Sequence, residues 1–358
     1  MQTSLNQYGW NKQWNKSFET YEAQGFTPAR ITSVARGQWT AINGDGIEIT
    51  LEAPGRFYQR TQEQNLWPLV GDFVAVSQHG DTHLIEHVLP RQTLLRRLDS
   101  FNEAEQPIAS NMDVVFIAIS MNKDYSDGRL ERYLASAWDS GAKPVVLLTK
   151  SDLCHDVEAM VQHTQSIAFG VDVHPISALS HDGLDTILSH LDIGQSATII
   201  GSSGVGKSTL LNALMGYEVN KTSGIREDDA RGRHTTTHRE MFLLPTGQLF
   251  IDTPGMREMG LTEEQGTGLS SSYSDIEELA QQCKFSDCKH ESEPGCAIKA
   301  ALEDGTLTQD RYKRYQKMLK ELKHLKRKMD LRNKKNLIEQ KNKKRRQAKL
   351  YRQHTKRR

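Results

Sequence analysis

The sequence of 358 residues predicts three folded parts in series: a small β-barrel, an α/β domain around a mostly parallel sheet, and a small cysteine-rich module followed by a basic tail. Three observations predict this order. Short β-like segments separated by turn signals come first, buried-type strands alternating with helical patterns follow, and three clustered cysteines with a histidine come last. The expected boundaries are 1–28 for a mobile arm, 29–98 for the barrel, 99–267 for the α/β domain, 268–308 for the cysteine module and 309–358 for the tail.

The net charge of +1 hides a strong asymmetry along the chain. Residues 311–358 carry 22 basic and three acidic side chains, a net charge of +19, so the other 310 residues sum to −18. A tail this basic indicates a polyanionic partner such as nucleic acid.

Several classes of protein are excluded by composition. Hydrophobic residues make up 37% of the chain, which is enough for packed cores, and no stretch approaches the ~18 apolar residues of a membrane-spanning helix. Residues 1–20 are polar and lack the apolar segment of a secretory signal. Clustered cysteines suit metal ligation in a reducing compartment better than a disulfide framework. We therefore expect a cytoplasmic protein with no membrane partner, and a monomer.

The barrel prediction rests on five short β-like runs within about sixty residues. The runs are 30–34, 38–42, 46–51, 72–76 and 83–88. An Asn-Gly-Asp-Gly sequence at 43–46 is a strong hairpin signal. This pattern favours an OB-fold, although another small barrel or half-sandwich would also fit it. The preceding residues are polar and rich in Asn and Gln, which indicates a mobile arm.

The α/β prediction rests on alternation between two kinds of segment. Buried-type strands at 114–119, 145–149, 197–201 and 248–252 alternate with helical patterns such as 128–140 and 208–215. Such alternation is typical of a mostly parallel sheet covered by helices.

A phosphate-binding loop joins one of these strands to the following helix. Residues 201–208 match G-x-x-x-x-G-K-[ST] in full, and we call this segment the P-loop. Its glycines let backbone N–H groups surround phosphate oxygens, Lys207 would reach the β- and γ-phosphates, and the Ser208 hydroxyl would bind Mg²⁺. Nucleotide contacts are expected from Gly201, Ser202, Ser203, Gly204, Val205, Gly206, Lys207, Ser208 and Thr209.

Three further segments are expected to contact the base, the metal and the γ-phosphate. Thr149-Lys150-Ser151-Asp152 follows a buried strand, and its Asp152 carboxylate can accept hydrogen bonds from the guanine N1–H and N2 amine, a donor pair that adenine lacks. Ser177-Ala178 could add a backbone contact to the guanine oxygen. In Asp252-Thr253-Pro254-Gly255 the carboxylate would hold Mg²⁺ and the Gly255 N–H would approach the γ-phosphate. The expected ligand is GTP with Mg²⁺.

The cysteine module contains Cys283, Cys288, His290 and Cys296 at the spacing C-x4-C-x-H-x5-C. Three thiolates and one imidazole form a closed tetrahedral set that is typical of structural zinc and leaves no open position for catalysis. Buried or redox-active cysteines are the alternative reading. Cys154 stands apart from this set and is expected to be an ordinary thiol.

The nucleotide motifs come in a permuted order, because the base-selecting segments precede the P-loop. The features that carry a family resemblance are this permuted order, the segments 68–72 (Pro-Leu-Val-Gly-Asp) and 232–237 (Gly-Arg-His-Thr-Thr-Thr), and the Cys/His set. Nearly the whole sequence resembles the circularly permuted small ribosomal subunit biogenesis GTPases of the RsgA family. The resemblance implies an OB-fold, a permuted P-loop GTPase domain and a zinc module. It also implies GTP hydrolysis during maturation of the 30S ribosomal subunit, with 16S rRNA as a partner.

The loop 221–238 is rich in Gly, Thr and charge, as expected of a segment that closes over Mg²⁺ and γ-phosphate. Matching the family pattern points to Thr236 as the closing residue, with its threonine neighbours as alternatives. No glutamine directly follows Gly255 to orient the attacking water, so His234 is the best candidate for that role and His238 the second. The plain alternative is a solvent-exposed loop histidine. The expected catalytic set is Lys207, His234 and Thr236.

Three functions fit these features. The first is a ribosome-stimulated GTPase that binds RNA through the barrel, the zinc module and the tail. The second is an RNA-binding protein with a slow guanine-nucleotide switch and no stimulated hydrolysis. The third, a GTP-using enzyme acting on a small substrate, is weakened because the sequence shows no second cluster of acid, base or nucleophile groups.

Overall fold

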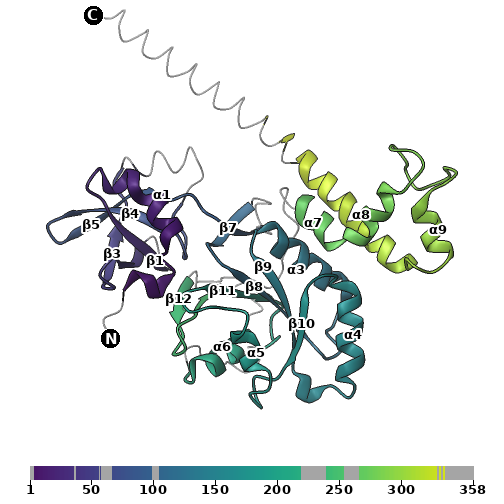
Figure 1. Cartoon of the computed structure of the whole chain (residues 1–358), viewed down its shortest axis with the longest axis horizontal. Coiled ribbons are helices and arrows are strands. Elements are labelled where there is room, and N and C mark those ends of the chain that lie inside the picture. Colours follow the sequence, from purple (N-terminus) through teal and green to yellow (C-terminus); the bar gives the residue numbers. More distant parts are fainter. Residues whose placement is uncertain are drawn as a thin grey trace, which may run out of the picture. The chain divides into compact units, whose positions relative to one another are not determined.

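A computed structural model describes residues 4–35, 38–55, 57, 67–98, 105–218, 239–253, 266–328, 330, 331 and 334 (Figure 1). Contacts divide the chain into two compact units. Unit 1 is Met1–Gly260 with Thr267–Ser274, and unit 2 is Leu261–Gly266 with Asp275–Arg358. The barrel and the α/β domain thus lie in one unit, and the cysteine module lies in the other. The finer domain boundaries stay predictions.

Five strands of unit 1 form a closed barrel. They are β1 (Thr27–Ala35), β2 (Gln38–Asn43), β3 (Glu48–Glu52), β4 (Phe73–His79) and β5 (Thr82–Val88). Their order is β1-β2-β3-β5-β4, and a β1–β4 pairing closes the ring. β3 and β5 run parallel, whereas the other four pairs of the ring are antiparallel. This is the topology of an OB-fold, so that prediction is confirmed.

The N-terminal segment differs from the mobile arm that its composition suggests. It forms a 3-10 turn, η1 (Leu5–Tyr8), and the helix α1 (Lys12–Glu22). Asn11 caps this helix, because its side-chain oxygen accepts hydrogen bonds from the backbone N–H groups of residues 13 and 14. Trp14 and Phe18, four residues apart, share one helix face and are buried against Phe73 of the barrel. Two aromatic residues at helical spacing outweigh the polar composition around them.

The α/β domain contains six strands that continue the sheet of the barrel. Its strands are β8 (Val114–Ser120), β9 (Lys143–Thr149), β10 (Asp172–Ile176), β11 (Ser196–Gly201), β12 (Arg239–Leu243) and β13 (Leu249–Asp252), in the order β10-β9-β8-β11-β13-β12. The first five in this order are parallel, and β12 is antiparallel to β13. The hairpin of β6 (Leu94–Leu98) and β7 (Glu105–Ser110) forms a separate two-stranded sheet.

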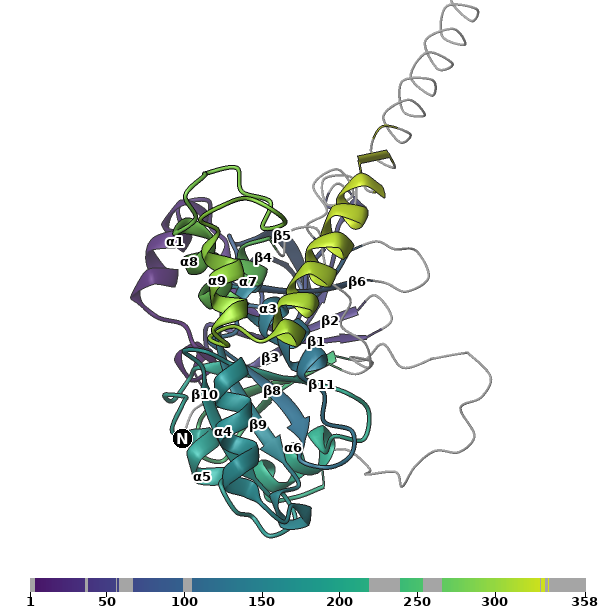
Figure 2. The same cartoon turned by 90° about the vertical axis from the view of Figure 1, so that its right-hand side faces the viewer.

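Helices cover both faces of this sheet (Figure 2). One face packs against α3 (Asp127–Asp139) and α4 (Val157–Ile167), and the other against α5 (Leu184–Leu188) and α6 (Lys207–Met215). Strands buried on both faces account for the continuous apolar runs in the sequence.

Strand β1 belongs to both halves of unit 1. Its residues 27–30 pair with β4 and complete the barrel. Its later residues Ser33 and Val34 pair with Glu240 and Arg239 of β12. The barrel and the α/β domain are therefore joined by backbone hydrogen bonds into one eleven-stranded sheet.

A buried arginine reinforces this junction. Arg30 is 2% exposed, and its guanidinium donates to the carbonyls of Tyr8 (2.6 Å), Gly71 (3.3 Å) and Asn111 (3.0 Å) and to the Ser196 hydroxyl (3.1 Å). Burial lowers the pKa of Arg30 to about 10, against the opposing effect of nearby carboxylates. The acceptors come from the arm, the barrel and the α/β domain, so one side chain joins all three.

Unit 2 contains α9 (Ala297–Glu303), most of α8 (Ser274–Gln281) and a helix over 309–328. Arg311 makes a bidentate ion pair with Asp275, with N–O distances of 2.7 and 2.8 Å. The Tyr315 hydroxyl donates to Glu277 at 2.7 Å. The pKa of Tyr315 is raised, mainly because the hydroxyl is buried. The basic tail thus begins as a helix anchored to α8, whereas residues 335–358 lie outside the described residues. Within the described part of the chain, the helices are too short or too polar to cross a membrane.

Replacing the buried arginine should loosen the whole of unit 1. We expect Arg30→Met to lower the free energy of unfolding by roughly 3–5 kcal/mol, because four acceptors lose a charged donor. Thermal unfolding monitored by circular dichroism measures this. Arg129→Met is the matched control, since that guanidinium donates to an exposed carbonyl, that of Asp124. Equal midpoints for the two variants would contradict the assigned role.

Candidate nucleotide site and metal centre

The P-loop connects β11 to α6 and is built on glycine conformations. Gly201, Gly204 and Gly206 have φ angles of 154°, 73° and 105°, which other residues rarely adopt. A side chain at Gly201 would also lie 2.5 Å from the Ala118 carbonyl oxygen of β8. The glycines at the ends of the motif are therefore needed for the path of the backbone as well as for access to phosphate.

Lys207 begins α6 and lies over the P-loop. Its ammonium donates to the carbonyl oxygens of Gly201 at 2.7 Å and Ser202 at 2.8 Å, which fixes its position beside the loop. Ser208 is exposed in the first turn of the helix, where the helix dipole favours an anion. Phosphates and Mg²⁺ can reach both side chains at this end of α6.

The base-selecting segment begins at the end of β9 and is held against the P-loop. The buried Thr149 hydroxyl donates to the Val205 carbonyl at 2.8 Å. Lys150 has φ of 61°, a left-handed conformation that turns the chain sharply into the 3-10 turn η2 (Ser151–Leu153). Asp152 is exposed in that turn and can accept hydrogen bonds from a base.

The remaining predicted residues lie at the ends of neighbouring strands. Ser177 directly follows β10 and is buried, and Ala178 is partly exposed after it. Asp252 is the last residue of β13, which pairs with the P-loop strand β11. Gly255, His234 and Thr236, with the alternative His238, lie outside the described residues.

The arrangement suits a nucleotide. The P-loop, the base-selecting segments and Asp252 all follow the carboxyl ends of adjacent parallel strands, the edge at which open α/β sheets bind ligands. Segments far apart in the sequence are thereby brought to one edge. Sequence reasoning missed the bond from Thr149 to the P-loop, because nothing in a T-K-x-D motif reveals which carbonyl its threonine meets.

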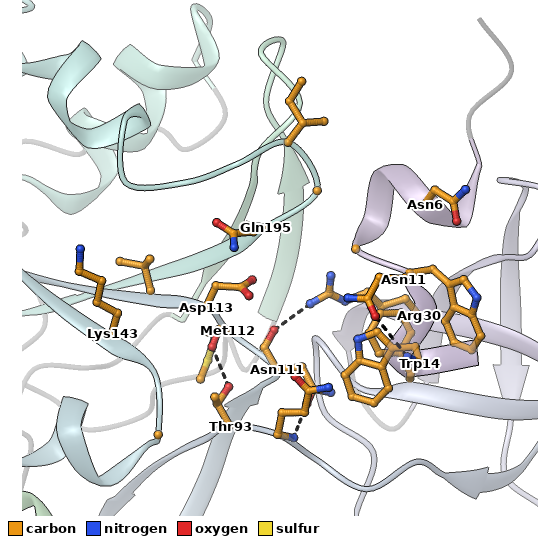
Figure 3. A pocket seen from close by; sticks show the side chains of 18 of the residues that line it. Asn6, Asn11, Trp14, Arg30, Thr93, Asn111, Met112, Asp113, Lys143 and Gln195 are labelled. Atoms are coloured by element: carbon orange, nitrogen blue, oxygen red, sulfur yellow. Dashed lines mark hydrogen bonds between the residues drawn. The ribbon is translucent and has the colours of Figure 1, made fainter. Parts of the chain in front are cut away.

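A pocket of about 490 Å³ lies at the opposite, amino-terminal edge of the sheet (Figure 3). Asn11 and Trp14 of the arm, Arg30 of the barrel, and Asp113 and Gln195 before β8 and β11 line it. None of the residues predicted to bind nucleotide lines this pocket. This pocket lies at the junction around Arg30 and is separate from the nucleotide edge.

The cysteine cluster in unit 2 has the geometry of a metal site. Ligand atoms of Cys283, Cys288, His290 and Cys296 all lie within 4.8 Å of one another. The Cys283–Cys296 sulfur distance is 3.9 Å, and the His290 Nδ1 lies 3.5 and 3.4 Å from these two sulfurs. A tetrahedron with Zn–S bonds of ~2.3 Å has edges of roughly 3.8 Å. The four side chains therefore fit a single tetrahedral ion.

Glu293 organises the loop between the last two ligands. Its carboxylate accepts hydrogen bonds from the backbone N–H groups of Lys289, Glu291 and Ser292. Backbone N–H groups, first its own and then that of Lys289, lower the pKa of Glu293 to about 2. The sequence offers one signal for this role, an acidic residue just before the Pro294-Gly295 turn.

Comparison with known proteins identifies the family. A model of the RsgA GTPase family matches residues 88–262, and a model described as a 50S ribosome-binding GTPase matches residues 196–335. A small ribosomal subunit biogenesis GTPase RsgA 2 of Listeria monocytogenes is 44% identical over 319 residues, which cover 89% of each chain. The chain belongs to the RsgA GTPase family. A relative named RsgA 1 in Oceanobacillus iheyensis is 40% identical over 91% of this chain and 93% of its own.

Two solved structures agree with membership of the RsgA family. YjeQ from Thermotoga maritima superposes with a TM-score of 0.62 at 27% identity, covering 83% of this chain and 98% of that one. YloQ, described as a circularly permuted GTPase, gives 0.60 at 25% identity, covering 84% and 96%. The predicted fold, an OB-fold barrel before a permuted GTPase domain and a Cys/His module, is confirmed, and the protein is a GTP hydrolase of this family.

Changing the base-selecting carboxylate should abolish selective guanine binding. We expect Asp152→Asn to weaken GDP affinity by at least about 100-fold, because the guanine donor pair would face an amide in place of a charged acceptor. Calorimetric titration with GDP measures the change. Asp192→Asn, at an exposed aspartate before β11, should leave affinity unaltered. Retained affinity in Asp152→Asn would show that another group reads the base.

Removing one ligand of the cluster should release the metal. We expect the wild-type chain to carry about one metal ion and Cys296→Ser to lose it, since a closed four-ligand site tolerates no missing ligand. Elemental analysis by mass spectrometry identifies and counts the ion. Cys154→Ser should keep the metal, because that thiol lies outside the cluster. Full metal content in both variants would argue against a shared site.

Proposed function

We propose that this protein binds the 30S ribosomal subunit through its 16S rRNA and hydrolyses GTP to GDP and phosphate during late small-subunit maturation, with turnover stimulated by the subunit. The observation that carries the proposal is the meeting of the P-loop, a guanine-type base segment and Asp252 at one sheet edge. The relatives' names, small ribosomal subunit biogenesis GTPases, supply the partner.

In the proposed site, the P-loop and Lys207 hold the phosphates and Asp152 reads guanine. Ser208, Asp252 and Thr236 bind Mg²⁺, which neutralises charge on the β- and γ-phosphates when it is present. The position of Ser208 at the N-terminus of α6 and of Asp252 on the neighbouring strand supports this assignment.

The strand register supports a role for the loop before β12. Glu240 of β12 lies opposite Asp252 of β13. Thr236 precedes Glu240 by four residues in the sequence, a span of at most about 14 Å, so the length of the chain permits the proposed role of Thr236. His234 lies two residues earlier in the same segment. We assign it to orient the attacking water, because no glutamine stands directly after Gly255.

We propose zinc as the ion of the cysteine cluster. Three sulfurs and one nitrogen at tetrahedral spacing suit Zn²⁺, and a closed ligand set suits a structural role. The ion would link the loop 283–296 to the start of α9 and so stabilise unit 2.

We propose that RNA is bound by the barrel, the zinc module and the basic tail. The barrel has the OB-fold, which commonly binds nucleic acid, and the helix over 309–328 begins the basic segment. We also propose that the protein acts in the cytoplasm as a monomer. The alternative of a slow nucleotide switch without stimulated hydrolysis is not favoured by the family to which the chain belongs.

The catalytic histidine can be tested apart from binding. We expect His234→Ala to reduce single-turnover GTP hydrolysis by about 100-fold while GTP affinity stays within about twofold, because water positioning acts in the transition state only. Quenched-flow measurement gives the rate, and titration with a non-hydrolysable analogue gives the affinity. His155→Ala, on the surface after η2, serves as the control. Unchanged turnover would assign the role elsewhere, first to His238.

Stimulation by the ribosome separates the proposal from its alternative. We expect purified 30S subunits to raise multiple-turnover hydrolysis by at least about tenfold, since a partner that binds the loop 221–238 would also position its catalytic groups. Phosphate release with and without subunits measures it, with 50S subunits as the control. Binding to 30S without faster hydrolysis would favour the slow-switch alternative.

A further inference from the structure

One buried hydroxyl beside the P-loop has no partner. Ser120 is the last residue of β8, it is 5% exposed, and its Oγ has no hydrogen-bond partner within the part of the chain that the structure describes. A buried hydroxyl without a partner costs roughly 1–3 kcal/mol, and such groups are rare in folded proteins. Its position therefore calls for a physical reason.

The strand pattern shows which way this hydroxyl points. Side chains alternate along a strand, so Ser120 shares its face of β8 with Phe116 and Ala118. These two pack in the same cluster as Val205 of the P-loop and Leu210 of α6. Ser120 therefore points to the face of the sheet that carries the P-loop.

The neighbouring strands place the hydroxyl more closely. Ser120 lies opposite Thr149 in the parallel β8–β9 pair, and Thr149 donates to the Val205 carbonyl of the P-loop. On the other side of β8, Gly201 lies opposite Ala118. Ser120 is thus next to Thr149, which is hydrogen-bonded to the P-loop. It also lies two residues after Ala118, the residue of β8 opposite the first glycine of the P-loop.

We infer that Ser120 is a positioning residue of the nucleotide site, whose hydroxyl bonds to the backbone of the P-loop once bound GDP or GTP has drawn the loop into its loaded form. This inference rests on the nucleotide site proposed above. The hydroxyl has no partner among the described residues, and the bond formed on loading contributes to nucleotide affinity. Ser120 touches neither the reacting atoms nor the base, so it acts on binding and leaves the chemical step unchanged.

The test compares stability and affinity in full-length Ser120→Ala. The midpoint of thermal unfolding without nucleotide should equal or exceed that of the wild type, because the variant removes an unpaired polar group. GDP affinity measured by calorimetry should fall about fivefold to tenfold, the value of one hydrogen bond. KM for GTP should rise by a similar factor with kcat unchanged, the signature of lost binding that is equal in the ground state and the transition state. Ser120→Cys, nearly the same size but a poorer donor, should lose affinity in the same direction.

Ser140→Ala is the matched control, since Ser140 is a buried serine whose hydroxyl has partners, the Ala137 carbonyl and the Ala142 N–H. It should lower the midpoint and leave affinity unaltered. A Ser120→Ala variant that loses stability but keeps affinity, or that changes neither, overturns the inference while the proposed function stands. A wild-type chain that binds no guanine nucleotide overturns both.

Discussion

The burial of one positive charge is the constraint on which unit 1 depends. The Arg30 guanidinium lies where the arm, the barrel and the α/β domain meet, and it is surrounded by carbonyl oxygens from all three. A buried cation is tolerated only when its N–H groups are paired. Each of the three parts supplies an acceptor, so the loss of any one of them would leave an N–H group of the guanidinium without its partner in the fold. This explains why an arm of polar composition is folded, and why contacts group the barrel with the GTPase domain.

Buried polar groups also matter at the edge of the sheet where the nucleotide motifs meet. Thr149 and Ser120 are neighbouring buried hydroxyls on adjacent strands, and only the first has a partner. The base-selecting segment is thereby fixed to the P-loop before any ligand arrives. The paired Thr149 helps to hold this edge in shape, whereas the buried hydroxyls of Ser120 and Thr253 have no partner among the described residues.

The candidate site residues could be chosen from the sequence because their signals are local. The P-loop glycines, the base-selecting Asp152 and the spacing of Cys283 to Cys296 each depend on a few adjacent residues. The helix of the arm could not be predicted from average polarity, which does not reveal that Trp14 and Phe18 are at helical spacing. The role of Arg30 could not be predicted, since its partners Tyr8, Asn111 and Ser196 are distant in sequence and are backbone or small polar groups. The unpaired state of Ser120 is equally invisible until neighbouring strands are known.

The strand shared by the two halves of unit 1 also protects the sheet. Without β1, the strand β12 would present a free edge of unpaired N–H and C=O groups, the surface through which β-proteins aggregate. The barrel pairs its first strand with the beginning of that edge, at Arg239 and Glu240, and the same strand is paired within the closed barrel. The OB-fold thus serves as a cap for the GTPase sheet. A GTPase domain cut free of its barrel would keep the P-loop and expose the backbone N–H and C=O groups at the start of β12 that β1 now pairs.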